Sequence, residues 1–151
     1  MALKEGSSAP DFKLKDGTER LHRLSQYRGR KVILYFYPKD DTPGCTVEAR
    51  GFNACLKEIE RKQAVVLGVS PDDAASHRRF CEKLSLGFPL LSDPEGKVAA
   101  KYGAYGEKTL YGRTFMGVYR TTYVIDEKGR IAKVFENVKV EGHCQAVLEA
   151  L

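Results

Sequence analysis

Short apolar runs alternate with longer segments of helical period along this chain. Three of the runs, Lys31–Tyr37, Ala64–Val69 and Phe88–Leu91, are apolar at nearly every position. Such continuous runs are typical of strands that are buried on both faces of a sheet. Two further strands, Thr121–Ile125 and Ile131–Phe135, flank a turn and are predicted to pair as a hairpin.

The segments between these strands have the spacing of helices. Apolar side chains recur at intervals of three and four residues, which places them on one face of each helix. The segment Phe12–Gly17 alternates instead and then turns, which predicts a short N-terminal hairpin. The predicted helices are Thr46–Gln63, a helix that runs to about Leu86, Lys97–Tyr105 and Gly142–Leu151.

The second of these helices has a recognisable start. Ser70 can serve as its N-cap, Pro71 suits the first helical position, and Asp73 lies where a capping box has its acid. Phe80 and Leu84 are four residues apart and are expected to face the core.

Alternating strands and helices followed by a hairpin predict an α/β fold with a mixed central sheet flanked by helices. The element order is compatible with a thioredoxin-like fold that carries the N-terminal hairpin as an extension. The chain has 151 residues, a length that fits one domain over residues 1–151.

Composition and charge exclude several classes of function. The net charge is +5, but Lys and Arg are scattered among acids and form no nucleic-acid motif, so nucleic acid is not expected as a partner. No apolar run is long enough to span a membrane, and Met1–Gly6 lacks a signal-peptide core. We therefore expect a cytoplasmic protein, whose four cysteines are redox-active, metal-bound or buried rather than permanently bridged.

Cys45 has the most informative position of the four cysteines. It follows the strand Lys31–Tyr37 and directly precedes the helix Thr46–Gln63. The free N–H groups and the dipole at a helix N-terminus favour negative charge, so a thiolate is stabilised there. This position predicts a reactive cysteine.

The residues around Cys45 suit a pocket for a peroxide. Pro38 can shield the pocket, and the hydroxyl of Thr42 can bond the thiolate or a peroxide oxygen. Glu48 lies one helical turn after Cys45 on the same face. A carboxylate beside a thiolate makes sense mainly as the group that orients a cation, and Arg120 is the candidate for that cation.

The motif Pro-x-x-x-Thr-x-x-Cys, present as Pro38, Thr42 and Cys45, resembles that of the peroxiredoxins. Longer stretches resemble the peroxiredoxin Q, or bacterioferritin comigratory protein, subfamily over nearly the whole chain. They are Gly6–Phe12, Phe36–Glu48 and Phe115–Asp126.

The resemblance implies an enzyme with a thioredoxin fold that reduces hydrogen peroxide and organic hydroperoxides. Cys45 would be its peroxidatic cysteine, Pro38, Thr42 and Arg120 would complete the pocket, and Glu48 would orient the arginine. The resemblance further implies thioredoxin as reductant, with glutaredoxin as the second candidate, and a monomer that needs no metal or organic cofactor.

A peroxidatic sulfenic acid needs a second thiol to form a disulfide. Many subfamily members carry that thiol five residues on, where this chain has Arg50. Cys55 would lie about 15 Å from Cys45 along one helix, at about 1.5 Å per residue, which is beyond disulfide range. We interpret it as a core residue. The place of Cys144 relative to Cys45 is not predictable, and a partly buried helix position is expected for it. A second subfamily type carries the resolving cysteine in the following helix at similar spacing, which favours Cys81.

Both Cys45 and Cys81 are predicted to lie in helices. Because a disulfide needs Cα atoms within about 4.4–6.8 Å, one or both helices must unwind locally before the bond forms. The segments Ser70–Asp73 and Leu86–Gly87 are the expected hinges.

Four other functions compete with a peroxidase. A thioredoxin-type oxidoreductase needs Cys-x-x-Cys, and a structural zinc site needs paired ligands; the sequence has neither. A cysteine hydrolase would need a histidine base such as His77 or His143, although all three histidines are expected at the surface. A redox sensor without turnover remains the non-enzymatic alternative.

Overall fold

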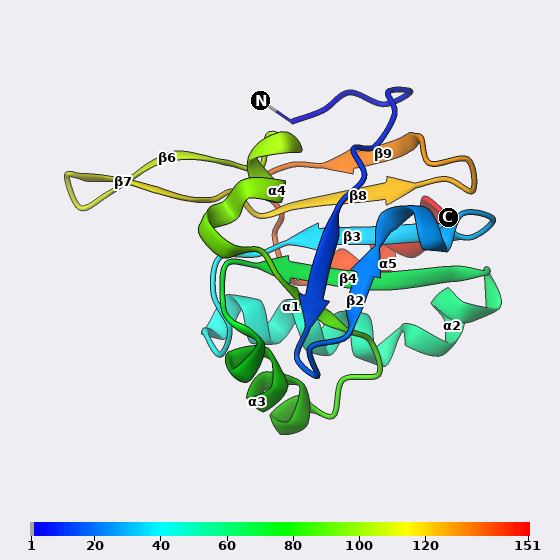
Figure 1. Cartoon of the computed structure of the whole chain (residues 1–151), viewed down its shortest axis with the longest axis horizontal. Coiled ribbons are helices and arrows are strands. Elements are labelled where there is room, and N and C mark those ends of the chain that lie inside the picture. Colours follow the sequence, from blue (N-terminus) through cyan, green and yellow to red (C-terminus); the bar gives the residue numbers. More distant parts are fainter. Residues whose placement is uncertain (1) are drawn as a thin grey trace.

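The main sheet has seven strands in the order β2-β1-β5-β4-β3-β8-β9 (Figure 1). The structure is a computed structural model that describes residues 2–151. Strands β3, β4 and β5 are parallel to one another, and the remaining pairs are antiparallel. The strands are β1 (Lys13–Asp16), β2 (Leu21–Arg23), β3 (Lys31–Phe36), β4 (Ala64–Ser70), β5 (Leu90–Ser92), β8 (Thr121–Ile125) and β9 (Ile131–Phe135). The predicted mixed sheet and both predicted hairpins are confirmed.

Strand β3 shows why both faces of the sheet are covered. Its even-numbered residues from Val32 to Phe36 belong to one buried apolar cluster, and the odd-numbered residues from Ile33 to Tyr37 belong to the other. Successive side chains of a strand point to opposite faces, so a strand that is apolar throughout needs a layer on each side.

The helices divide between the two faces. Helices α1, α2, α3 and α5 contribute to the cluster with Ile33, and α4 contributes to the cluster with Val32. Their bounds are α1 (Pro43–Ala54), α2 (Leu56–Arg61), α3 (Ala74–Leu84), α4 (Lys97–Lys101) and α5 (His143–Glu149), with 3₁₀ turns at Leu24–Tyr27 and Pro94–Gly96. Within residues 2–151, no helix is both long and apolar enough to cross a bilayer.

The helix predicted over Thr46–Gln63 is broken at Cys55. This residue ends α1 and precedes α2, with φ −92° and ψ 1°. Gly51 and Asn53 have low helix propensity, which weakens the last turn of α1. Ile59 of α2 is fully buried, so the second segment keeps its own contact with the core.

The predicted start of the next helix is wrong. Ser70 continues β4 and pairs with Ser92 instead of capping a helix. Asp73 is the N-cap of α3, and its carboxylate accepts a hydrogen bond from the Ser76 amide at 2.9 Å. The side chain of Ser70 favours a helix cap, but the pairing of β4 with β5 keeps this residue in the strand.

A third hairpin, β6 (Tyr105–Leu110) with β7 (Arg113–Val118), was not predicted. It forms its own two-stranded sheet and projects away from the rest of the molecule (Figure 1). The helix predicted to reach Tyr105 ends at Lys101. Most hairpin residues are exposed, so the hairpin lacks the alternation of apolar and polar residues that marks a half-buried strand.

Candidate active site

Cys45 lies in the first turn of α1, directly after the loop that follows β3. Thr42 is the N-cap in an extended conformation, and Pro43 is the first helical residue. The first hydrogen bond of the helix runs from the Thr46 amide to the Thr42 carbonyl at 2.9 Å. The amides of Gly44 and Cys45 precede this bond and are available to an anion. Only 1% of Cys45 is exposed, so its sulfur is shielded from water.

Arg120 connects Cys45 with Glu48. Its Nη2 donates to the Cys45 sulfur at 3.3 Å, and its Nη1 donates to Glu48 Oε1 at 2.6 Å. A Cβ atom at Gly44 would lie 3.2 Å from Nη2, so glycine leaves room for the guanidinium. The predicted cation and its predicted acid therefore meet at the sulfur. A charged donor at this distance stabilises a thiolate.

Burial sets the electrostatics of this group. The desolvated carboxyl of Glu48 has a pKa raised to about 7, although Arg120 acts in the opposite direction. Burial alone would lower the pKa of Arg120, but the charges of Glu48 and Cys45 raise it above its usual value. The arginine therefore stays charged between two acidic groups.

Pro38 and Thr42 belong to the segment between β3 and α1, just before Cys45 in the chain, and both are half-buried. The Thr42 hydroxyl donates to the Lys39 carbonyl at 2.9 Å. The structure therefore does not contain the expected bond from this hydroxyl to the thiolate. The hydroxyl instead closes the loop that leads into α1.

Cys81 lies in α3 as a free, half-buried thiol. Burial, together with the charge of Asp40, raises its pKa to about 11. It packs against the same apolar cluster that contains Cys45. The prediction that both cysteines lie within helices is confirmed.

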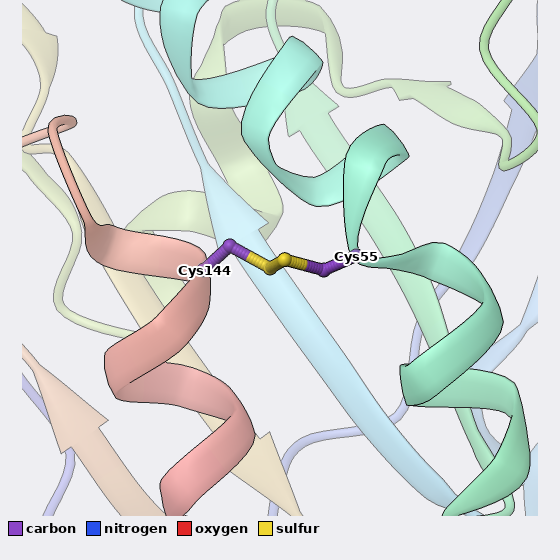
Figure 2. The surroundings of a disulfide bond; sticks show 2 residues. All are labelled: Cys55 and Cys144. Carbon is purple, nitrogen blue, oxygen red and sulfur yellow. A yellow bond between two sulfur atoms is a disulfide. The ribbon is translucent and has the colours of Figure 1, made fainter.

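Cys55 and Cys144 form a disulfide, which the sequence did not predict (Figure 2). Their Cα atoms are 6.7 Å apart, and 89 positions separate them in the chain. Cys55 packs against the core and Cys144 lies in a helix, α5, as expected, but the expectation that no cysteine is permanently bridged is wrong. The break after α1 and the packing of α5 against α1 bring the two together, and no local pattern encodes that contact.

The prediction that the histidines are at the surface is also wrong, because all three are buried. His22 contacts Asp16 at 2.7 Å, and His143 Nε2 lies 2.8 Å from the Thr122 hydroxyl. Burial, followed by the charge of Arg120, lowers the pKa of His143 to about 4. His77 is completely buried beside Asp40.

Comparisons with known proteins agree with this geometry. The AhpC/TSA family matches residues 6–134. A putative peroxiredoxin bcp of Helicobacter pylori strain J99 is 49% identical over 99% of this chain and 98% of its own length. Peroxiredoxin Bcp of Bacillus subtilis strain 168 is 41% identical over 100% of this chain and 96% of its own.

A solved structure extends the likeness to three dimensions. The bacterioferritin comigratory protein of Xanthomonas campestris superposes with a TM-score of 0.91 at 35% identity. The alignment covers 97% of this chain and 96% of that one. The predicted thioredoxin-like peroxiredoxin fold is thereby confirmed, and the chain belongs to the AhpC/TSA family, among the peroxiredoxins of the Bcp and peroxiredoxin Q type.

Proposed function

We propose that this chain is a thiol-dependent peroxidase in which Cys45 reduces hydrogen peroxide and organic hydroperoxides. The contact of Arg120 with the Cys45 sulfur carries this proposal, because it places a fixed cation at a buried thiol on a helix N-terminus. The Xanthomonas campestris relative is described by its alkyl peroxide reduction activity, which supports an organic hydroperoxide as one substrate class here.

In the first step the Cys45 thiolate attacks one peroxide oxygen and the O–O bond breaks. Cys45 becomes a sulfenic acid, and the departing oxygen takes up a proton and leaves as water or an alcohol. Arg120 and the amides at the start of α1 stabilise the charge that develops on the oxygens. Pro38 and Thr42 form the edge of the pocket, and Glu48 holds Arg120 in place.

In the second step the Cys81 thiol displaces water from the sulfenic acid. A Cys45–Cys81 disulfide forms, and the sulfenic hydroxyl group leaves with the thiol proton as water. Both residues lie in helices, so local unwinding precedes the bond. Unwinding also removes the burial that raises the pKa of Cys81, which makes this thiol a better nucleophile.

An external dithiol protein then reduces the disulfide and becomes oxidised itself. We propose thioredoxin as this donor, with glutaredoxin as the alternative, and a monomeric enzyme in the cytoplasm.

Coupled turnover tests this function. Peroxide consumption is measured with NADPH, thioredoxin reductase and thioredoxin, and the peroxide-treated protein is mapped for disulfides. We expect many turnovers per enzyme, a Cys45–Cys81 bond, no activity in Cys45→Ser, and over-oxidation of Cys45 without recycling in Cys81→Ser. A single turnover with every reductant would favour the redox sensor, and full coupled activity in Cys81→Ser would refute the resolving role.

A further inference from the structure

A cluster of buried and half-buried polar side chains lies between the loop of Cys45 and the helix of Cys81. It consists of Tyr37, Asp40, Asp72, Ser76 and His77, called here the Asp40 cluster. Asp40 is 6% exposed and His77 is 0% exposed. None of these residues has a part in the peroxidase steps described above.

The carboxylate of Asp40 is the centre of the cluster. Its Oδ1 accepts from the Tyr37 hydroxyl at 2.5 Å, and its Oδ2 accepts from the Ser76 hydroxyl at 2.8 Å. His77 Nδ1 lies 2.7 Å from the same Oδ2. His77 Nε2 lies 3.0 Å from the Leu91 carbonyl, which can only accept, so this nitrogen carries a proton. Asp40 and His77 thereby join the loop, the first turn of α3 and β5.

Asp72 fixes the backbone on the other side of Asp40. Its Oδ2 accepts from the Asp40 amide at 2.8 Å and from the Ser70 hydroxyl at 2.6 Å. Its carbonyl accepts from the Ser92 hydroxyl at 2.6 Å. Ligand atoms of Asp40, Asp72 and His77 lie within 4.8 Å of one another. However, the two carboxylates already accept from protein donors, so the cluster is a brace within the fold.

Beyond the buried Phe80, the polar contacts of the C-terminal half of α3 lie at the surface. The Lys83–Asp41 ion pair is 60% and 58% exposed on its two side chains, and exposed pairs of this kind contribute little. The Asn53 side chain bonds Ser85 and Gly87 at the surface. Ser85 also has a φ of 53°, a left-handed conformation that is unfavourable for residues other than glycine.

We propose that the Asp40 cluster is the pivot of the resolving step, with Asp40 and His77 as positioning residues. The cluster keeps the loop of Cys45 and the first turn of α3 in place, while α3 unwinds from Cys81 toward Gly87. This inference rests on the proposed Cys45–Cys81 disulfide. It replaces the sequence-based expectation of a hinge at Ser70–Asp73 and retains the hinge at Leu86–Gly87.

The pivot explains how Cys81 can move without being lost to solvent. Cys81 follows His77 by four residues, so it lies one turn beyond the fixed part of α3. A short unwound segment that is held at His77 before it and at Phe88 after it samples few positions, which raises the effective concentration of its thiol near Cys45. If α3 instead unwound from Ala74, the segment would be longer and Cys81 would search a larger volume.

Amide hydrogen exchange of the reduced and the peroxide-oxidised protein tests the pivot. We expect the amides of Asp40, Ser76 and His77 to keep their protection within about twofold, and those of Ser85 and Leu86 to lose at least about tenfold. Asp40→Asn keeps an acceptor for Tyr37 but places an NH₂ group opposite Ser76 and His77. In the oxidised form of Asp40→Asn, the protection of the amides against exchange should fall throughout α3.

Two further variants control this experiment. Ser76→Ala removes one bond without leaving a buried charge, so it reports on the pivot if Asp40→Asn does not fold. Asp41→Asn removes the exposed ion pair of the neighbouring residue and should behave as the wild type. Disulfide mapping of each sample separates the two proposals. Two results would overturn the pivot alone, provided that the Cys45–Cys81 bond forms. One is loss of protection at the His77 amide in the wild type. The other is that protected and exchanging amides of α3 meet at the same residue in Asp40→Asn and Ser76→Ala as in the wild type. Absence of that bond overturns the resolving step and the pivot together.

Discussion

The guanidinium of Arg120 donates to the Cys45 sulfur and to the Glu48 carboxylate through different nitrogen atoms. A planar fork can serve two acceptors in this way, whereas a lysine ammonium is a single point of charge. The peroxidatic role proposed for Cys45 therefore calls for an arginine at this position.

Replacing Arg120 by alanine should slow the attack of Cys45 on hydrogen peroxide by about 10²- to 10³-fold, the usual cost of one lost charge-stabilising donor. Stopped-flow measurement of the second-order rate constant checks this. Arg50→Ala is the matched control, since Arg50 is an exposed arginine on the same helix. A change of less than about twofold in Arg120→Ala would rule out its proposed role.

Helix α1 has Cys45, the proposed peroxidatic cysteine, in its first turn and a disulfide directly after its last residue. The Cys55–Cys144 bond joins this end of α1 to α5, so two helices on the same face of the sheet are fixed at a point remote from Cys45 (Figure 2). Cross-links between residues far apart in sequence stabilise mainly by restricting the unfolded chain.

Cys144→Ser should lower the free energy of unfolding by about 4.6 kcal/mol, as the chain-entropy relation gives for so long a loop. Denaturant unfolding with and without a thiol reductant measures this. The reductant should destabilise the wild type by a similar amount and leave Cys144→Ser unchanged. The rate of the first peroxide step should stay within about twofold, because position 144 lies in α5, at the disulfide with Cys55 that follows the C-terminal end of α1, whereas Cys45 lies in the first turn of α1. Equal stability of wild type and variant under oxidising conditions would show that the Cys55–Cys144 bond does not stabilise the fold.

At the scale of the whole molecule, two buried groups make stability depend on pH in opposite directions. Glu48 has a folded-state pKa of about 7, above its ordinary value of 4.5. Its contribution to stability therefore falls as pH rises from 4.5 to about 7. His143 has a folded-state pKa of about 4, below its ordinary value, so stability falls as pH drops from about 6.5 toward 4. The two effects partly cancel between about pH 4.5 and 6.5.

Glu48→Gln should remove one of these two effects. The amide oxygen can still accept from Arg120, but the side chain no longer ionises. Relative to the wild type, the variant should gain stability as pH rises from about 4.5 to 7, by up to about 3 kcal/mol. Chemical denaturation at a series of pH values measures the difference. A difference that does not vary with pH would show that Glu48 does not change its ionisation on folding.

The alternation of strands and helices was predictable because each element is encoded by residues close together in the chain. The continuous apolar run of β3 predicted a buried strand, and its neighbours followed from similar runs. Predictions failed where contacts between elements overrode local preference. Ser70 has the side chain of a helix cap, yet its pairing with Ser92 makes it a strand residue. The β6–β7 hairpin was missed because few of its residues are buried.

The sequence alone determined the position of Cys45 between a buried strand and a helix, the residues Pro38 and Thr42 in its loop, and the resemblance to peroxiredoxins. All of these depend on residues within one short segment or on motifs that can be compared directly. The resemblance also assigned Glu48 to Arg120, 72 positions away, and the structure contains that contact. Only the tertiary structure decided the other distant contacts, such as the bond between Cys55 and Cys144, 89 positions apart, and the contact of His77 with Asp40. Such contacts form because packed layers bring together segments whose local patterns carry no information about one another.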